Sequence, residues 1–467
     1  MKDIIKQTNA EFIEKELKPF LRIPSNTLNT EGIATALDFI KSYLSGFCDD
    51  LKEIKGEINP LLLATVKGIS KEALLIYMMY DTQPVNKNEL WISDPFEAEE
   101  KTLSPPLNSL GKCIIARGAY NSKTPLMCFL NVIKLMKENN SLPLSLHLLF
   151  DGEEEIGSPT LLNFLETQKE TLKLCGNAFY PSIKQDISGT SVLKLGYKGI
   201  VSLTLKIYTK NKEPHSAFSA MIPNPATELI SLLSSLYSNN EFQLKCLKES
   251  YELTTEEQDI INKLIKELNI EKIKQKAGII ETIEDDPKKA FINYLFKPTF
   301  NISTLKSGFL ERGTKNMVAN QALCNIDIRF AHNISTEKIF KEIGERIENF
   351  TQQSKAHIEL TKNLGYEGSR VNKDSFLVKS LIKSFDLLNV HTEIWPLSAA
   401  AAPLSKIQKE LGLNFIVGGL GIGGFAHAPN EFVQIDSIIN TRLSNYYFLK
   451  TYYEMLEEKK TERENKK

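Results

Sequence analysis

The sequence predicts an α/β fold that is interrupted by a smaller α+β domain. Strand-like and helix-like patterns alternate from residue 61 to a helix that starts near Pro159, which is typical of a largely parallel sheet with both faces covered. The pattern changes near residue 199 and returns near residue 370. We therefore predict one domain from 1–198 and 370–467, with 199–369 inserted into it. A chain of 467 residues is also longer than one core usually organises.

The first domain contains elements of clear periodicity. The run LSLHLLF at 144–150 is apolar and partly alternating, as expected of a buried strand. The stretch TPLMCFLNVIKLMKE predicts a helix with Thr124 as its N-cap and Pro125 at its first position. The predicted elements before residue 199 are helices at 7–21, 32–46, 124–138 and from near Pro159, and strands at 61–68, 73–81 and 144–150.

The inserted domain alternates strand, helix, strand and helix around a helical insertion near 240–292. This insertion is rich in Lys and Glu, which predicts solvated helices. After residue 370, a small-residue loop and a strand precede a final helix at 436–457, and the tail from 461 onward is predicted to be disordered. The other elements predicted after residue 199 are strands at 200–210 and 322–330, helices at 224–237, 335–353 and 375–387, and the strand at 413–420.

Composition excludes several classes of partner. A formal net charge of -1 gives no reason to expect nucleic acid or an anionic membrane. No apolar run approaches the roughly 20 residues that span a bilayer, and the N-terminus lacks the apolar core of a signal peptide. The six cysteines are scattered, without the spacing of a zinc knuckle or a disulfide framework. A cytoplasmic protein is therefore predicted.

The stretch DGEEEIGS, from Asp151 to Ser158, follows the buried strand directly. Consecutive carboxylates at a strand end are costly to bury unless each has a partner or a metal. Ligands of open α/β sheets bind at the carboxyl ends of strands, so chemistry is expected here. The alternative is a solvated acidic turn before a helix N-terminus, where carboxylates favour the helix dipole.

Six motifs occur in an order that resembles a known family. These motifs are YMMYDTQPV (77–85), RGAYNSK (117–123), DGEEEIGS (151–158), LGYKG (195–199), PHSAFSA (214–220) and FAHAPNE (425–431). Together they resemble the dinuclear zinc peptidases and deacylases of the acetylornithine deacetylase, succinyl-diaminopimelate desuccinylase and carnosinase type. The resemblance implies a three-layer zinc-peptidase domain with a mixed, mostly parallel sheet and an inserted ferredoxin-like lid. It also implies lid-mediated homodimers that act on small peptides or N-acyl amino acids.

The resemblance assigns roles to individual residues. It implies that Glu154 is the general base and that Asp81 orients a metal ligand. A lid His would stabilise the oxyanion, and an Arg would bind the substrate carboxylate. A structural salt bridge with Asp327 is an alternative for Arg329, and a satisfied loop histidine is an alternative for His427. The remaining assignments are metal ligation by Glu155 and His427, the oxyanion role for His215, and substrate binding by Arg329 and Asn430.

The departures from the family pattern concern the metal ligands. Met79 stands where the first zinc-binding His would be, and Asn121 replaces the bridging Asp. The remaining Asp ligand falls near Ser182, with no carboxylate before Asp186. A thioether does not replace a His for zinc, and an amide oxygen is a poor ligand. The loop lining the substrate site also changes, to Ala-Ala-Ala-Ala-Pro at 399–403.

Two hypotheses follow from this mixture of matches and losses. In the first, the protein is an inactive or binding-only homologue, a pseudoenzyme whose di-zinc hydrolysis is lost or strongly reduced. In the second, it is a working enzyme with altered acyl-transfer or amide chemistry that uses Glu154 and His215. For both, Asn121 is at best a weak third ligand beside Glu155 and His427, so the sequence leaves open one zinc or other divalent ion, or none.

Overall fold

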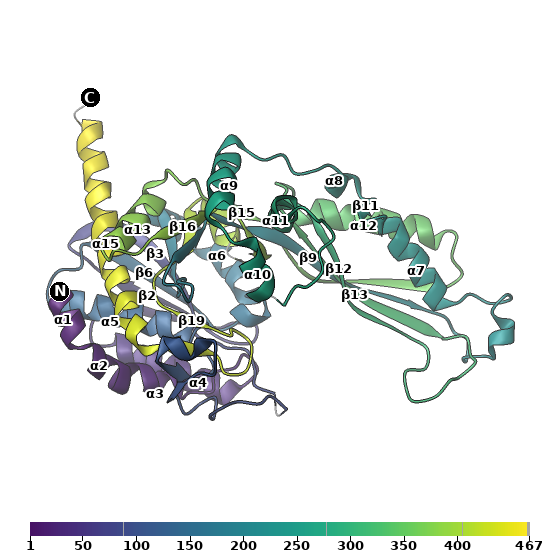
Figure 1. The fold of residues 1–467 in the computed structure, drawn as a ribbon, viewed down its shortest axis with the longest axis horizontal. Helices are drawn as coiled ribbons and strands as arrows, with labels where there is room; N and C mark the ends of the chain where they lie inside the picture. The colour runs from purple at the N-terminus through teal and green to yellow at the C-terminus, as the bar shows by residue number, and fades with distance from the viewer. Residues whose placement is uncertain (87, 277, 404, 465–467) are drawn as a thin grey trace. The chain divides into compact units, whose positions relative to one another are not determined.

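The chain divides into two compact units. The computed structural model describes residues 1–86, 88–276, 278–403 and 405–464 (Figure 1). Unit 1 comprises 1–195, 370–395 and 406–467, and unit 2 comprises 196–369 and 396–405. The second unit is thus inserted into the first.

A six-stranded mixed sheet organises unit 1. Its strand order is β1-β2-β6-β3-β7-β18. The pairs β6–β3, β3–β7 and β7–β18 are parallel, whereas β1 and β2 run antiparallel to their neighbours. The parallel strands are almost continuously buried and apolar, as strands covered on both faces must be. The strands are β1 (Asp50–Ile54), β2 (Leu61–Val66), β3 (Ser70–Met79), β6 (Leu144–Asp151), β7 (Asn177–Pro181) and β18 (Asn414–Gly418).

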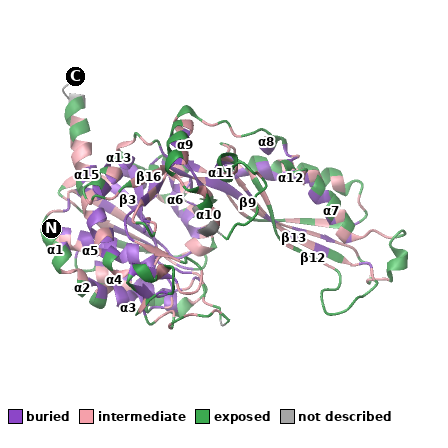
Figure 2. Ribbon diagram, viewed as in Figure 1, coloured by how far each residue is buried: buried purple, intermediate pink, exposed green. Residues whose placement is uncertain are grey.

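Helices pack on this sheet and on one another. Figure 2 shows the buried residues gathered on the strands and on the inward faces of these helices. Helix α5 contacts β3, β7 and α15, and twelve of its residues are buried. The main helices of unit 1 are α4 (Thr30–Leu44), α5 (Lys123–Glu138), α6 (Pro159–Leu172), α13 (Phe376–Asp386) and α15 (Ile435–Glu464).

A second, four-stranded sheet of unit 1 supports the loop before α15. Its order is β19-β20-β5-β4, and Phe432 and Ile115 are buried in a small apolar cluster there. This sheet was not predicted, because its strands are only two to four residues long. The strands are β4 (Glu99–Thr102), β5 (Lys112–Ile115), β19 (Gly423–Gly424) and β20 (Phe432–Gln434).

Unit 2 is built on a six-stranded sheet whose four long strands are antiparallel, with helices on one face. The strand order is β12-β13-β9-β14. Alternate residues of β9 and β13 form one core with α7 and α12, as period-two burial predicts. The elements are β9 (Gly196–Tyr208), β12 (Thr299–Ser307), β13 (Gln321–Phe330), β14 (His357–Tyr366), α7 (Pro225–Leu236) and α12 (Thr336–Thr351).

The insertion within unit 2 is helical but not simply solvated. Apolar side chains such as Ile261 and Leu295 are fully buried. A capping box, in which Thr254 and Glu257 each satisfy the other's backbone N–H, begins α9. The insertion contains α8 (Lys245–Lys248), α9 (Thr255–Glu267), α10 (Ile270–Lys276) and α11 (Pro287–Phe296).

Three sequence predictions need correction. The N-cap of α5 is Ser122 rather than Thr124, which lies inside the first turn and is buried. The predicted disorder of the tail is wrong as far as Glu464, where α15 ends; residues 465–467 lie outside the described residues. The single helix predicted at 7–21 is instead a succession of short helical segments from Lys2 to Leu21.

Within the described part of the chain, no helix combines the length and apolar character that crossing a bilayer requires.

Candidate active site

Neighbouring strand ends bring the acidic residues together. Met79 at the end of β3 pairs with Asp151 at the end of β6, so the segments that follow lie side by side. Asp81 is fully buried and accepts hydrogen bonds from the backbone N–H groups of Glu154 (3.3 Å) and Glu155 (3.1 Å). Its Oδ2 also accepts from the Thr27 hydroxyl at 2.8 Å. Asp81 therefore fixes the turn that carries both glutamates.

Burial shifts the pKa of Asp81. Desolvation raises the pKa of Asp81 well above its ordinary value, and the charges of Asp151 and Glu155 raise it further. The hydrogen bonds to Thr27 and Glu155 act in the opposite direction. The strand ends thus gather carboxyl groups with perturbed pKa in a buried place, which is a frequent property of functional sites.

The acidic stretch divides into structural and site carboxylates. Asp151 Oδ1 accepts from Glu153 N at 2.8 Å, and Asp151 Oδ2 accepts from the Tyr77 hydroxyl at 2.9 Å. Glu153 is fully buried, and its carboxylate accepts three backbone N–H groups, from Ile58 (2.8 Å), Asn59 (2.8 Å) and Thr160 (2.9 Å). Asp151 and Glu153 therefore hold the loop and the start of α6 in place.

Glu154 differs from its neighbours. It is half-buried, and none of the described residues hydrogen-bonds to its carboxylate. Burial raises the pKa of Glu154 well above its ordinary value, and the nearby charges of Glu155 and Asp81 add to the shift. A carboxyl group with a raised pKa and free oxygens has the properties of a general acid or base.

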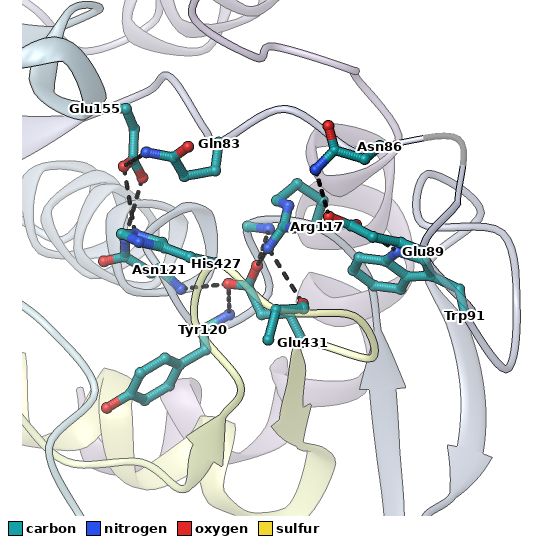
Figure 3. A network of polar contacts seen from close by, with 12 residues as sticks. Gln83, Asn86, Glu89, Trp91, Arg117, Tyr120, Asn121, Glu155, His427 and Glu431 are labelled. Carbon is teal, nitrogen blue, oxygen red and sulfur yellow. Dashed lines mark hydrogen bonds and ion pairs between the residues drawn. The ribbon is translucent and has the colours of Figure 1, made fainter. Parts of the chain in front are cut away.

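Glu155 is the centre of a polar cluster, seen from close by in Figure 3. Gln83 Nε2 donates to Glu155 Oε2 at 2.7 Å, and Asn121 Nδ2 donates to Glu155 Oε1 at 3.3 Å. His427 Nε2 lies 3.3 Å from Glu155 Oε2 and 3.1 Å from Asn121 Nδ2. The hydrogen bond to Glu155 raises the pKa of His427, although burial opposes the shift. The structure thus brings together the predicted residues Glu155, Asn121 and His427.

A second buried network holds two loops of this cluster (Figure 3). Glu431 is fully buried, and its Oε1 accepts from the N–H groups of Tyr120 (3.0 Å) and Asn121 (2.7 Å). Its Oε2 accepts from Gly118 N (3.0 Å) and from Arg117 Nη1 (2.9 Å). Burial raises the pKa of Glu431, and these hydrogen bonds oppose the shift. Sequence reasoning assigned no role to Glu431 or Arg117, although both lie in quoted motifs.

The loop before Glu431 has an unusual backbone. Phe425, His427 and Asn430 have φ of 59°, 63° and 63°, in the left-handed region that non-glycine residues seldom adopt. Such strain is found where the surrounding structure over-determines a site. Asn430 Oδ1 accepts from Ile92 N at 2.7 Å, which secures a neighbouring loop, and the substrate role assigned to Asn430 stays a prediction.

With this geometry established, comparison with known proteins identifies the family. The family model described as peptidase family M20/M25/M40 matches residues 75–446. The chain belongs to this family. It is 26% identical to the Cys-Gly metallodipeptidase dug1 of Schizosaccharomyces pombe over 307 residues, which are 64% of this chain and only 62% of that protein. It is 24% identical to the Cys-Gly metallodipeptidase DUG1 of Candida albicans, over 94% of each chain.

Solved structures of M20 proteins have the same fold. The M20 family metallo-carboxypeptidase Sso-CP2 from Sulfolobus solfataricus superposes with a TM-score of 0.83 at 27% identity, covering 94% of this chain and 98% of that one. The dipeptidase Dug1p from Saccharomyces cerevisiae has a TM-score of 0.80 at 19% identity, covering 97% and 98%. The zinc-peptidase fold and the membership of an exopeptidase family, both predicted from the motifs, are confirmed.

M20 peptidases are generally metal-dependent, which raises the question of whether this donor set suits two ions. Met79 is 1% exposed at the end of β3 and offers a thioether. Among the described residues, no three of His, Cys, Asp and Glu gather where they could hold a metal ion. The residues present therefore do not fit a dinuclear centre. Glu155 and His427, with the amide of Asn121, form the one partial donor set found in the described cluster.

The region around Ser182 offers no replacement ligand among the described residues. Ser182 is buried, and its N–H donates to Gly418 O at 2.8 Å. A Cβ at Gly419 would lie 2.1 Å from the Ser182 carbonyl oxygen, so this backbone approach requires glycine. Asp186, the next carboxylate, accepts from Ser188 N (2.9 Å) and Thr190 N (3.0 Å) and closes its own turn.

Two predicted site residues belong to unit 2. His215 is exposed, and its Nδ1 accepts from Ala217 N at 3.2 Å, which caps a short 3₁₀ turn. Arg329 lies on β13, with its Nε 3.7 Å from Asp327 Oδ1. The structural salt bridge that the sequence left open for Arg329 is therefore present, and its substrate role stays a prediction.

Proposed function

We propose that this chain acts on or binds small peptides or N-acyl amino acids and that its di-zinc hydrolysis is lost or strongly reduced. The M20 family assignment and the dipeptidases among its relatives support the ligand class. One observation carries the second part of the proposal. The amide nitrogen of Asn121 donates to Glu155 and approaches His427, at the place where an anionic ligand would have to converge with them.

The physical reason is the strength of the missing groups. Amide hydrolysis by this type of enzyme depends on a metal-activated water and on charge stabilisation of the tetrahedral intermediate. Each of these effects contributes several kcal/mol, on the order of 10²-fold to 10³-fold or more in rate. A chain with Met79 and Asn121 in place of ligands is expected to lose most of that rate.

Metal content and peptide cleavage test this proposal together. The purified protein would be dialysed against Zn²⁺, Mn²⁺ or Co²⁺ and analysed by mass spectrometry, and Cys-Gly and β-Ala-His would be offered as substrates. We expect one ion or none per chain and cleavage no faster than that of the Glu154→Gln variant. Two ions per chain with rapid cleavage that Glu154→Gln abolishes would refute the proposal.

A second candidate function is supported by Glu154 alone. Its carboxyl group is free of hydrogen bonds from the described residues and has a raised pKa, which suits a group that takes up and releases a proton. We propose as the alternative an acyl-transfer or amide chemistry that uses Glu154 and His215 with one metal or none. Turnover of activated acyl esters that disappears in both Glu154→Gln and His215→Ala would support it. Turnover unchanged in Glu154→Gln would exclude it.

We further propose a cytoplasmic homodimer. All six cysteines are free thiols, as a reducing compartment favours. β12 is an edge strand of unit 2 with Ile302 and Leu305 exposed, and an edge of this kind is prone to pair with another chain. Light scattering of the purified protein and of an Ile302→Lys/Leu305→Lys variant tests the assembly, which we expect to be a dimer only in the unmodified chain.

A further inference from the structure

The carboxylate of Glu431 joins two loops of the polar cluster. It accepts four N–H donors from 117–121, the segment that ends in Asn121. Glu431 itself ends the loop that carries His427. Arg117 adds a second connection, because its Nη1 also donates to Ala428 O at 3.4 Å. The positions of Asn121 and His427 are thus set by one buried ion pair, and both of its side chains are 1% exposed.

The side chains of Glu155, Asn121 and His427 all lie within contact distance of one another. The separations are 3.3 Å between Glu155 Oε2 and His427 Nε2, 3.1 Å between Asn121 Nδ2 and His427 Nε2, and 3.3 Å between Asn121 Nδ2 and Glu155 Oε1. Ligands that lie about 2.1 Å from a tetrahedral zinc ion are separated from one another by about 3.4 Å. The first two separations share His427 Nε2, and the third involves the other oxygen of Glu155, so each pair of side chains has the spacing of two ligands of one ion and the mismatch is chemical.

The mismatch lies in the amide of Asn121. Its Nδ2 carries two hydrogens, which point toward an acceptor and not toward a cation. Rotating the amide would present an oxygen, but a neutral one, and would break the hydrogen bond to Glu155. A carboxylate at this position would supply the missing negative charge without any movement of the backbone.

We propose that Glu431 is a positioning residue that keeps Asn121 and His427 in the geometry of a three-ligand site, so that the single change Asn121→Asp creates a site for one divalent cation. This inference rests on the proposed absence of a tight metal site in the unmodified chain. Glu431 acts on the backbone that carries Asn121, through hydrogen bonds, and not as a ligand itself.

Zinc binding by matched variants tests the inference. Equilibrium dialysis with Zn²⁺ would compare the unmodified chain, Asn121→Asp, Asn121→Asp/Glu431→Gln and Asn121→Asp/Arg442→Lys. The carboxamide of Gln keeps one acceptor and turns an NH₂ group toward backbone N–H donors, so it releases one side of the network. Arg442→Lys serves as the control, because Arg442 is a buried side chain whose partners are Ile5, Thr8, Asn9 and Asn131.

The expected results differ between variants. Asn121→Asp binds one Zn²⁺ per chain at least tenfold more tightly than the unmodified chain. Its melting temperature falls in EDTA, where two carboxylates face each other, and rises again with Zn²⁺. Adding Glu431→Gln weakens zinc binding by about 10-fold to 100-fold, as changes behind metal ligands do. Adding Arg442→Lys lowers the melting temperature and leaves zinc affinity within about twofold.

Three outcomes would overturn the inference. If Asn121→Asp binds zinc no more tightly than the unmodified chain, the side chains at 121, 155 and 427 are not positioned to bind one ion. If Glu431→Gln and Arg442→Lys weaken zinc binding equally, Glu431 contributes only to the stability of the fold and does not position the ligands. If Glu431→Gln does not fold, Glu431→Asp replaces it, and unchanged affinity there also refutes the role. The proposed function fails separately, through two ions and rapid peptide cleavage in the unmodified chain.

Discussion

Two adjacent glutamates are predicted to respond in opposite ways to the same substitution. Glu153 is buried and accepts three backbone N–H groups at 2.8–2.9 Å. In Glu153→Gln the single oxygen can serve Ile58 and Asn59, which leaves the NH₂ group facing Thr160 N–H. A lost charge-assisted hydrogen bond with a buried donor left unpaired costs about 1.5–3 kcal/mol. The lost charge near the start of α6 adds about 0.5 kcal/mol, so we expect a loss of about 3 kcal/mol.

Glu154→Gln is the matched control. Because burial and like charges raise the pKa of Glu154 in the folded state, the unfolded chain releases this proton first as pH rises. The unmodified protein therefore loses stability as pH increases from the unfolded-state pKa of about 4.3 toward the higher folded-state value. The glutamine variant lacks this loss. We expect it to match the unmodified protein near pH 4 and to exceed its stability at pH 7.

Urea unfolding of the three proteins at pH 4 and pH 7 measures these effects. Hydrogen exchange of the backbone locates the loss in Glu153→Gln, since the Thr160 amide that is released should exchange faster than the amides of Ile58 and Asn59. Equal free energies of unfolding for the two variants at pH 7 would show that the division of the acidic stretch into structural and site carboxylates is wrong. A loss below about 1 kcal/mol in Glu153→Gln would lead to the same conclusion.

Three further substitutions have defined outcomes. Burial lowers the pKa of Lys123 to about 7, so the folded state releases this proton at a lower pH than the unfolded chain does. Between pH 7 and 10, the free energy of unfolding of the unmodified protein should therefore rise relative to that of Lys123→Met, by up to about 1.4 kcal/mol per pH unit. Urea unfolding measures this difference. Arg442→Lys should cost about 2–4 kcal/mol, because a single ammonium cannot replace the guanidinium that reaches Asn131 and the N-terminal helices; differential scanning calorimetry measures this. Thr254→Ala should cost about 1 kcal/mol and speed hydrogen exchange at the start of α9, where the capping box with Glu257 is lost.

The sequence predicted the fold and the neighbourhood of the site, because both follow from periodicity and ordered motifs. Glu155, Asn121 and His427 meet as the motif order implied. The role of Glu153 was not predictable, since its partners Ile58 and Asn59 come from a loop more than ninety residues away. Three consecutive glutamates in a sequence do not show which of them a distant loop will bury and hydrogen-bond.

Three other features could not be predicted from the sequence, for related reasons. The side-chain oxygen of Asn430 accepts from Ile92 N, a contact that the motif does not reveal. Glu431 lies in the same motif without an assigned role, because a buried carboxylate surrounded by backbone N–H groups has no signature in composition or spacing. Thr124 satisfied the rule for an N-cap, but the N-cap is Ser122, and the helix begins at Lys123, two residues before the predicted first position at Pro125. The partners of Asn430 and Glu431 come from loops distant in the sequence, so the local pattern does not predict them.

The discontinuity of unit 1 has a consequence for its synthesis. β7 receives its neighbour β18 only after residue 418 is made, and the N-terminal helices receive Arg442 later still. At a translation rate of about 5–20 residues per second, the first 195 residues wait roughly 15–50 s for the remainder of their own unit. During that interval an apolar strand edge has no partner, so nascent chains are expected to need chaperones. Chains terminated before Asn414 should be degraded or aggregate rather than accumulate as a half-domain.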